Sequence, residues 1–332
     1  MLRIGVLGAG RIGSMHAELL AHRVPGAALS GVYDVTSAAG EVAGRLGVAR
    51  FGSVADALAG SDAVAICTPT GSHAELIVAA AEAGCAIFCE KPVSLDLDEV
   101  DRALGAVADA GVPFQIGFNR RFDPGHAAVA AAVADGTVGA PQLVRISSRD
   151  PAPPPMAYVR GSGGIFLDMT IHDFDMARFV SGSEVVEVFA RGAVRIDDGF
   201  AAADDVDTAV VTLVHADGCL TTIDNSRQAV YGYDQRVEVF GSAGMAVSEN
   251  PLAHAAIVRT RDGMRGATLP YFYVERYIPS YLGEWRAFVD AVAAGDAPPV
   301  GPVDARAPLV IGLAAWRSLR ESRPVSLTEV AA

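Results

Sequence analysis

The first 118 residues alternate between short apolar runs rich in β-branched residues and longer alanine-rich segments with helical spacing. This order is typical of repeated βα units, in which parallel strands are buried on both faces by the helices that join them. We therefore predict a doubly wound parallel sheet. The expected strands lie at 2–7, 28–33, 49–51, 63–67, 85–89 and 113–118, and the expected helices at 12–22, 36–46, 54–58, 73–83 and 97–110.

A glycine motif, GAGRIG, follows the first expected strand and opens the first expected helix. In a GxGxxG motif of this kind the first glycine permits a tight turn, the second lets the backbone approach a pyrophosphate, and the third allows close packing of helix against strand. The free N–H groups and positive dipole end of the helix then favour phosphate oxygens. The sequence predicts a dinucleotide site formed by Gly8, Gly10, Arg11, Ile12 and Gly13.

An acidic residue, Asp34, ends the second expected strand at the distance where a carboxylate can hold the ribose hydroxyls of a bound dinucleotide. A carboxylate there repels a 2′-phosphate, and the following Val35 and Thr36 offer no guanidinium to receive one. We therefore expect NAD rather than NADP as cofactor.

After residue 120 the sequence pattern changes: alternating runs of apolar and polar residues become longer, and fewer helical segments lie between them. We expect strands at 142–148, 207–215, 219–226, 236–240 and 255–259, and helices at 125–134, 166–180, 280–294 and 305–320. Successive strands without intervening helices favour an open, mostly antiparallel sheet. The predicted organisation is a Rossmann domain over 1–120 and an α+β domain over 121–332.

The charge, the apolar runs and the cysteines of the sequence indicate which kinds of partner and which cellular compartment to expect. The net charge of −13 argues against nucleic-acid binding, and no apolar run approaches the roughly 20 residues that span a bilayer. The first residues carry no export signal, and the four cysteines lack metal-ligand spacing such as CxxC. We expect reduced core cysteines and a cytoplasmic protein.

Two stretches at strand ends carry polar residues, CTPTGSH at 67–73 and CEKPVS at 89–94. Ligands of open α/β sheets bind outside the carboxyl ends of strands, so these stretches are expected to face the cofactor. A lysine there could place positive charge beside a substrate oxygen, and the alternative is a solvated lysine before a turn proline. The expected cofactor-side residues are Thr68, Pro69, His73, Glu90 and Lys91.

A third stretch, GGIFLDMTIHDFDMARF at 163–179, combines acids with a histidine. On one helix Asp168 and His172 would share a face, with Asp175 nearly on the same side. A histidine oriented by a carboxylate can serve as a general base. The alternatives are acids that favour a helix N-terminus and a metal site, although no cysteine lies near in sequence to complete a zinc site.

Taken in order, the motifs GAGRIG, TPTGSH, EKP and GGIFLDMTIHDFD resemble those of the Gfo/Idh/MocA oxidoreductase family over essentially the whole chain. The runs GFNRRFDP, SRDPAPPP, DVDTA and YGYDQRVEVFG are most similar to the inositol 2-dehydrogenases of that family. The resemblance implies a catalytic set of Lys91, Asp168 and His172, without metal. It also implies a second domain whose open sheet mediates homotetramer formation.

The implied activity is NAD-dependent oxidation of a secondary hydroxyl of a small polyol, myo-inositol to 2-keto-myo-inositol (scyllo-inosose), in inositol catabolism. The alternatives are another inositol isomer, an aldose, reduction of a cyclic imine, or a redox sensor without catalysis, which would predict a broken catalytic set. Relatives carry Met where this chain has Asn119, a departure that bears on substrate preference. The remaining implied substrate residues are Arg121, Asp150, Asp175, Tyr231 and Tyr233.

Overall fold

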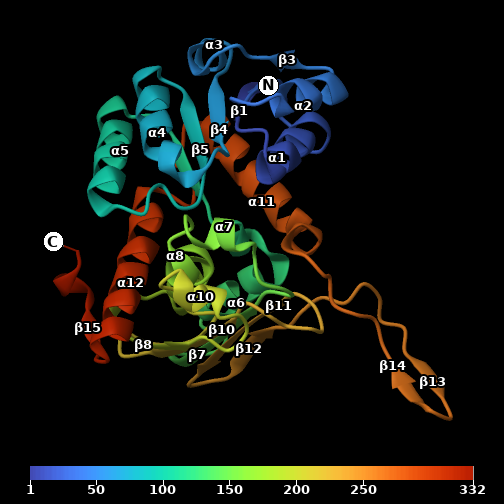
Figure 1. Ribbon diagram of the computed structural model, residues 1–332, viewed down its shortest axis with the longest axis vertical. Helices are drawn as coiled ribbons and strands as arrows, with labels where there is room; N and C mark the ends of the chain where they lie inside the picture. The colour runs from blue at the N-terminus through green and yellow to red at the C-terminus, as the bar shows by residue number, and fades with distance from the viewer. Residues whose placement is uncertain (332) are drawn as a thin grey trace. The chain divides into compact units, whose positions relative to one another are not determined.

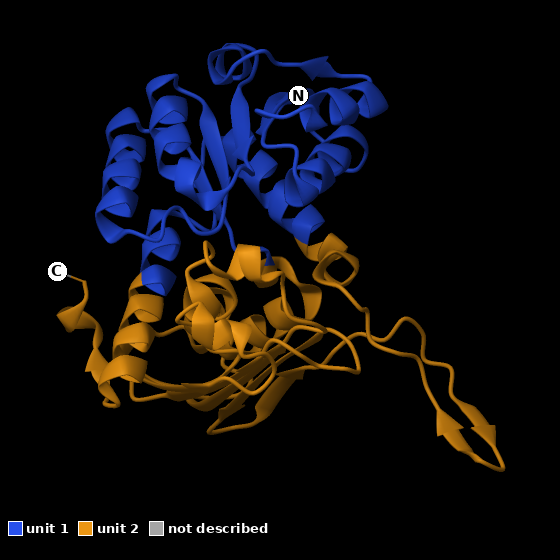
Figure 2. Ribbon diagram, viewed as in Figure 1, with its two compact units in different colours: residues 1–119, 281–309 blue, residues 120–280, 310–332 orange. Residues whose placement is uncertain are grey.

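The computed structural model describes residues 1–331, and the chain forms two compact units (Figures 1 and 2). Unit 1 contains residues 1–119 together with 281–309, and unit 2 contains residues 120–280 together with the chain from residue 310 on. The chain therefore leaves unit 1 close to the boundary expected at residue 120. It later returns, so part of the stretch assigned to the second domain belongs to the first unit.

Unit 1 is built on one sheet of six parallel strands in the order β3-β2-β1-β4-β5-β6. This is the strand order of a Rossmann fold. It confirms the predicted doubly wound sheet. The strands are β1 (Leu2–Leu7), β2 (Ala27–Tyr33), β3 (Ala49–Arg50), β4 (Ala63–Ile66), β5 (Ala86–Glu90) and β6 (Phe114–Gly117).

The helices of unit 1 begin and end where the sequence provides caps. In α5 (Leu97–Ala110), Asp96 accepts a hydrogen bond from the Glu99 N–H at 3.1 Å, and Gly111 takes a left-handed conformation with φ of 64° after the last turn. The other helices are α1 (Arg11–His22), α2 (Ala38–Leu46), α3 (Val54–Ala59), α4 (His73–Glu82) and the short η1 (Thr70–Ser72).

The core of unit 1 is completed from the far end of the chain by α11 (Tyr273–Ala294). Trp285 of this helix is fully buried, and its ring stacks on that of Phe88 in β5 with 4.3 Å between ring centroids. Phe288 packs edge-on against both rings. The aromatic cluster thus joins residues about 200 positions apart in sequence.

Unit 2 contains a mixed sheet of seven strands in the order β12-β11-β7-β10-β9-β8-β15. Among the described residues, β7 and β10 run parallel and the other neighbours run antiparallel. The mostly antiparallel sheet was expected, but β8 and β12 were not. The strands are β7 (Pro141–Arg149), β8 (Val185–Ala193), β9 (Thr208–His215), β10 (Leu220–Ser226), β11 (Asp234–Gly241), β12 (Met245–Ser248) and β15 (Val325–Ser326).

One face of this sheet packs against helices and the other is open to solvent. Along β9, Val211 is fully buried while its neighbour Val210 is 55% exposed, as expected for alternating side chains. The helices of unit 2 are α6 (Pro124–Ala134), α7 (Met156–Val159), α8 (Gly164–Asp168), α9 (Ile171–Ser181), α10 (Gly199–Ala202) and the later part of α12 (Pro302–Glu321). Phe166 and Phe174 belong to the covered core, and the helices that carry them, α8 and α9, lie over one face of the sheet (Figure 1).

Two predicted elements were wrong. The single helix expected over 166–180 is two helices, α8 and α9, separated by Met169 and Thr170. The strand expected over 255–259 is replaced by a two-stranded hairpin of β13 (Val258–Thr260) and β14 (Gly263–Arg265), which lies outside the seven-stranded sheet (Figure 1).

Within residues 1–331, no helix is both long and apolar enough to span a membrane.

Candidate active site

The glycine loop of unit 1 can be built only with small residues. Gly8 has φ of 98°, and a Cβ there would lie 2.6 Å from the carbonyl oxygen of Cys67. A Cβ on Gly13 would clash with the carbonyl oxygen of Gly8, whereas one on Gly10 would meet nothing within 4 Å. Gly10 also caps α1 without any side chain, so open space lies before free helix N–H groups. These residues fit the pyrophosphate of a dinucleotide.

The carboxylate of Asp34 is fixed beside this loop. One oxygen accepts a hydrogen bond from the Ala9 N–H at 2.7 Å, and the other accepts from the N–H and hydroxyl of Thr36 at 2.8 and 2.7 Å. Burial raises the pKa of Asp34, but these hydrogen bonds outweigh it and hold the pKa below its usual value. Asp34 is therefore ionised at neutral pH, as its expected role toward ribose requires.

His73 ties together the two loops that follow β4 and β5. Its Nδ1 lies 2.8 Å from the carbonyl oxygen of Pro92, and its Nε2 lies 2.7 Å from that of Thr68. Burial lowers the pKa of His73 below its usual value, and the hydrogen bonds with the two carbonyl oxygens offset only part of this effect. The ring thus sets the spacing between the loops that carry Thr68 and Lys91.

At Glu90, the last residue of β5, lies a cluster of buried groups that the sequence did not predict. Trp285 donates to Nδ1 of His16 at 2.8 Å, so the ring carries its proton on Nε2 and donates to Glu90 at 2.8 Å. Glu284 is fully buried, and neither of its carboxyl oxygens has a hydrogen-bond partner among the described residues. Burial, and then the charge of Glu90, raise the pKa of Glu284 well above its usual value, so Glu284 is a neutral acid.

The remaining residues expected on the cofactor side of unit 1 differ in exposure. Arg11 is exposed and Ile12 is half-buried in the first turn of α1, while Pro69 is exposed ahead of η1. Lys91 is half-buried and precedes a cis peptide bond to Pro92.

In unit 2, Asp168 is the last residue of α8 and its carboxylate is held at both oxygens. The hydroxyl of Tyr158 donates to one oxygen at 2.7 Å, and the guanidinium of Arg227 donates to the other at 3.0 Å. Arg227 also reaches Asp150 at 3.3 Å. Two residues expected in the substrate site, Asp150 and Asp168, therefore share one cation that the sequence did not single out.

His172 lies in the first turn of α9 and is half-buried. Its backbone N–H donates to the carbonyl oxygen of Met169 at 3.3 Å, so a hydrogen bond spans the break between α8 and α9. Asp168 and His172 are therefore at facing ends of two short helices instead of one turn apart on a single helix.

Two other expected substrate residues, Arg121 and Asp175, bind each other. The guanidinium donates two hydrogen bonds to the carboxylate, at 2.9 and 2.6 Å, in a bidentate pair. Asp175 is only 1% exposed, and the guanidinium lies 5.2 Å from the ring centroid of Phe179. Asn119, at the start of η2 (Asn119–Phe122), is buried, and its Nδ2 has no hydrogen-bond partner among residues 1–331.

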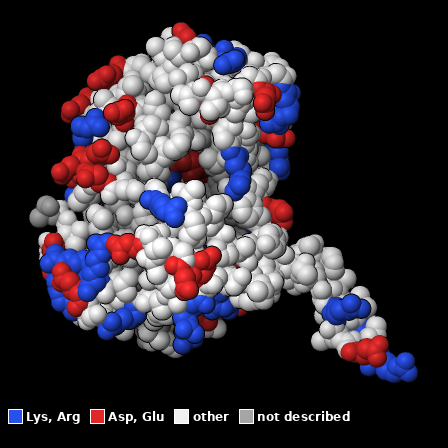
Figure 3. Space-filling model, in the orientation of Figure 1, with Lys and Arg blue, Asp and Glu red and all other residues white. Residues whose placement is uncertain are grey.

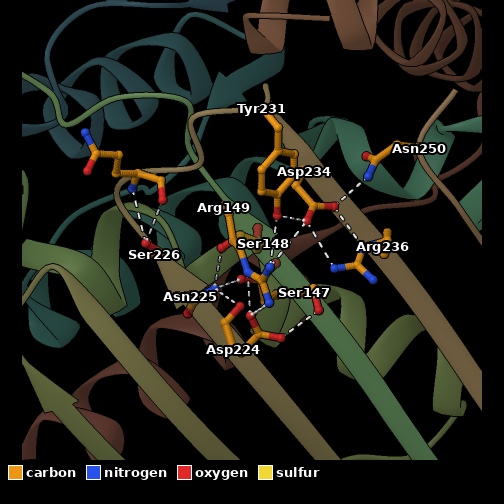
Figure 4. A network of polar contacts seen from close by, with 12 residues as sticks. Ser147, Ser148, Arg149, Asp224, Asn225, Ser226, Tyr231, Asp234, Arg236 and Asn250 are labelled. Carbon is orange, nitrogen blue, oxygen red and sulfur yellow. Dashed lines mark hydrogen bonds and ion pairs between the residues drawn. The ribbon is translucent and has the colours of Figure 1, made fainter. Parts of the chain in front are cut away.

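The two expected tyrosines belong to different networks. Tyr233 is buried and accepts a long hydrogen bond, 3.4 Å, from Arg120, a buried cation that also pairs with Asp173 at 2.6 Å. Tyr231 is 51% exposed, accepts from Arg149 at 2.9 Å and donates to Asp234 at 2.6 Å (Figure 4). The structure thus places Tyr231 in a polar network on β7 and β11, apart from the contacts of Asp168.

Charges of both signs are interspersed over the face shown in Figure 3. Among residues 1–331, no three His, Cys, Asp or Glu side chains are grouped as metal ligands. The four cysteines are free thiols and buried, and burial raises the pKa of Cys67 and Cys89 well above its usual value.

Comparison with known proteins gives the family. Residues 2–118 match the family described as oxidoreductases with an NAD-binding Rossmann fold, and residues 126–247 match the GFO/IDH/MocA C-terminal domain. The chain is 48% identical to a myo-inositol 2-dehydrogenase of Thermotoga maritima, over 99% of each chain. It is 45% identical to an inositol 2-dehydrogenase of Rhizobium meliloti, over 98% of this chain and 99% of the relative.

The fold agrees with this similarity. A crystal structure of a probable dehydrogenase from Thermotoga maritima superposes with a TM-score of 0.97 at 47% identity, covering 99% of this chain and all of the other. The protein is an NAD-dependent dehydrogenase, and it belongs to the GFO/IDH/MocA family of oxidoreductases.

Proposed function

We propose that this dehydrogenase oxidises a secondary hydroxyl of a cyclitol, with myo-inositol giving 2-keto-myo-inositol (scyllo-inosose). The observation that carries the proposal is full-length similarity, at 48% identity, to a protein named as a myo-inositol 2-dehydrogenase. The site chemistry supports it. A cyclitol offers hydroxyls alone, and unit 2 supplies carboxyl and hydroxyl side chains at Asp150, Asp168 and Tyr158 that suit such a ligand.

In the proposed reaction Lys91, Asp168 and His172 form the catalytic set. His172 takes the proton of the reacting hydroxyl as general base, and Lys91 stabilises the oxygen while it carries negative charge. Asp168 orients the pair, with its own carboxylate held by Tyr158 and Arg227. Bound NAD supplies the acceptor for the hydride, so the carbinol carbon becomes a ketone and one proton is released.

The glycine loop and strand ends would hold the cofactor, and Lys91 and Asn119 of unit 1 together with polar residues of unit 2 would hold the polyol. The proposed cofactor residues are Gly8, Gly10, Arg11, Ile12, Gly13, Asp34, Thr68, Pro69, His73, Glu90 and Lys91. The proposed substrate residues are Lys91, Asn119, Arg121, Asp150, Asp168, His172, Asp175, Tyr231 and Tyr233. Tyr231 has the least support, because both polar contacts of its hydroxyl lie in the network of Arg149 and Asp234.

The deciding assay measures NADH formation from myo-, scyllo- and D-chiro-inositol beside glucose and xylose. We expect the highest kcat/KM with an inositol. A preference for an aldose would overturn the cyclitol proposal, and NAD binding without turnover of any substrate, cyclic imines included, would favour a redox sensor.

The base is tested separately with His172→Ala. Turnover should fall by about two to four decades, the range typical of a general base, while NAD still binds. Turnover within a few-fold of wild type would exclude His172 as the base.

We also propose that the enzyme acts in the cytoplasm, in inositol catabolism, as a homotetramer. Support for assembly comes from the open face of the unit 2 sheet, where Val210, Leu220 and Phe240 are 55%, 40% and 44% exposed. Apolar side chains grouped in this way are typical of protein–protein interfaces.

A further inference from the structure

The parallel pairing of β7 and β10 brings Asp150 and Arg227 to one edge of the sheet. Arg149 is in register with Ser226, and the Asp150 N–H donates to the carbonyl oxygen of Ser226 at 2.9 Å. The residue that follows β7 is Asp150, and the residue that follows β10 is Arg227. Since parallel strands end at the same edge, a carboxylate and a guanidinium 77 positions apart leave the sheet side by side.

The guanidinium of Arg227 is enclosed by acids. Its side chain is 3% exposed, and its two terminal nitrogens reach Asp150 at 3.3 Å and Asp168 at 3.0 Å. Asp205 is a third carboxylate in the same environment, anchored by the N–H groups of Ile165 and Val206 at 3.0 and 2.8 Å. A buried cation among three acids balances charge that no hydrophobic residue could balance.

Building on the proposed function, we propose that Arg227 is a positioning residue: it keeps Asp150 and Asp168 ionised together and fixes the orientation of the Asp168 carboxylate for the base, His172. Arg227 acts through these two acids. Its fork geometry matters because each terminal nitrogen serves a different carboxylate, which a lysine ammonium cannot reproduce.

The surrounding charges make this cation necessary. Burial raises the pKa of Asp150, the charge of Arg227 lowers it, and the charge of Asp168 raises it again. The other groups whose charges interact with these acids are Tyr158 of α7, Tyr233, Asp205 and Arg120, and of these Arg120 alone is a permanent cation. Without Arg227, Asp150 and Asp168 would compete for one proton, as close carboxylates do. A protonated acid donates where the ionised one accepts.

The test compares Arg227→Met with Arg227→Lys and with the double variant Asp150→Asn/Arg227→Met. In R227M we expect kcat/KM at pH 7 to fall about 100-fold, which corresponds to roughly 2.7 kcal/mol. In R227M, the pH below which kcat/KM falls should rise by at least about one pH unit, because Asp168 would then be ionised only at higher pH. We call this falling part of the profile the acidic limb. R227K should keep the acidic limb of the pH profile at its wild-type position, with about a tenfold loss in kcat. In the double variant the acidic limb should lie closer to its wild-type position than in R227M.

A second readout does not depend on the substrate. The free energy of unfolding of R227M, relative to wild type, should decrease as pH rises from about 4 to 8, because the folded acids would then lose protons without a counter-ion. The double variant should reduce this dependence. Arg45→Met, at a surface pair with Glu18, is the matched control and should leave both profiles unchanged.

The outcomes separate the two proposals. A wild-type enzyme that oxidises no inositol would refute the proposed function, whereas the unfolding profiles would still report on the charge balance around Arg227. A uniform loss of rate in R227M, with an unmoved acidic limb and a pH-independent loss of stability, would overturn the role given to Arg227. If R227M does not fold, R227K and the double variant decide. An acidic limb shifted from the wild-type position by the same amount in both would overturn the role given to Arg227.

Discussion

The carboxylate of Asp34 connects the glycine loop to the site expected for ribose. It accepts hydrogen bonds from the Ala9 N–H within the loop and from the Thr36 N–H beyond β2, so it supports the backbone on both sides. We predict that Asp34→Ser weakens NAD binding at least about tenfold and reduces the preference for NAD over NADP. Titration of both cofactors measures this. Unchanged affinities would contradict the assigned role.

Glu284 allows a prediction about the pH dependence of stability. Its folded-state pKa is raised, so its contribution to stability is complete below the pKa of the unfolded chain, about 4.5, and is lost as pH rises toward the raised value. Glu284→Gln removes this titration. Relative to wild type, the variant should gain about 1–3 kcal/mol in free energy of unfolding between pH 5 and pH 8. Urea unfolding at both pH values tests it, and a difference independent of pH would contradict a neutral Glu284.

At the scale of single residues, the sequence predicted what local spacing determines. Gly8, Gly13 and Asp34 have the backbone and contacts that their motif requires. Arg227 and Glu284 could not be found in this way, because each owes its environment to residues from distant parts of the chain. The signal for Arg227 was weak but present: an arginine directly after a strand that pairs in parallel with one ending before Asp150.

Helices and strands were predictable where one pattern dominated. The helix over 97–110 was located at both ends because Asp96, the spacing of buried residues and Gly111 agree. The break between α8 and α9 was missed because apolar residues continue at helical spacing on both sides of it, at Leu167 and Ile171. Conversely, the alternating run at 255–259 predicts a strand of the large sheet, yet its side chains are exposed and it forms no part of that sheet.

The start of α8 gives a prediction at the scale of an element. Gly164 has φ of 75°, and a Cβ there would lie 2.8 Å from Asp205 and 2.6 Å from Trp316. We expect Gly164→Ala to lower the free energy of unfolding by about 1–3 kcal/mol. Gly105→Ala in α5, where a Cβ meets nothing within 4 Å, is the control and should add up to about 1 kcal/mol. Equal effects in thermal unfolding would show that the turn before α8 is not constrained.

The open sheet face of unit 2 is the surface through which we propose that subunits associate. If this face joins subunits, Val210→Asp should place unpaired charges in the interface and shift the homotetramer to smaller species. Light scattering after gel filtration measures the change. Val303→Asp, at a valine of α12 that is 69% exposed, should leave the assembly intact. An unaltered mass for V210D would exclude this face as the interface.

At this scale the sequence indicated a boundary near residue 120 but not the return of the chain to unit 1. Helical periodicity shows which face of a helix is buried, but it does not show which core the helix joins. Trp285 and Phe288 lie on an amphipathic helix that would suit either unit, and contact with Phe88 decides the matter.

The split first unit also bears on how the protein is made. When the ribosome has released residues 1–119, the six-stranded sheet is complete in sequence, but Phe88 still lacks the aromatic rings of Trp285 and Phe288. The nascent residues 1–119 therefore keep an uncovered apolar surface until about another 190 residues have been synthesised and unit 1 is complete. During that interval they are a natural client for chaperones.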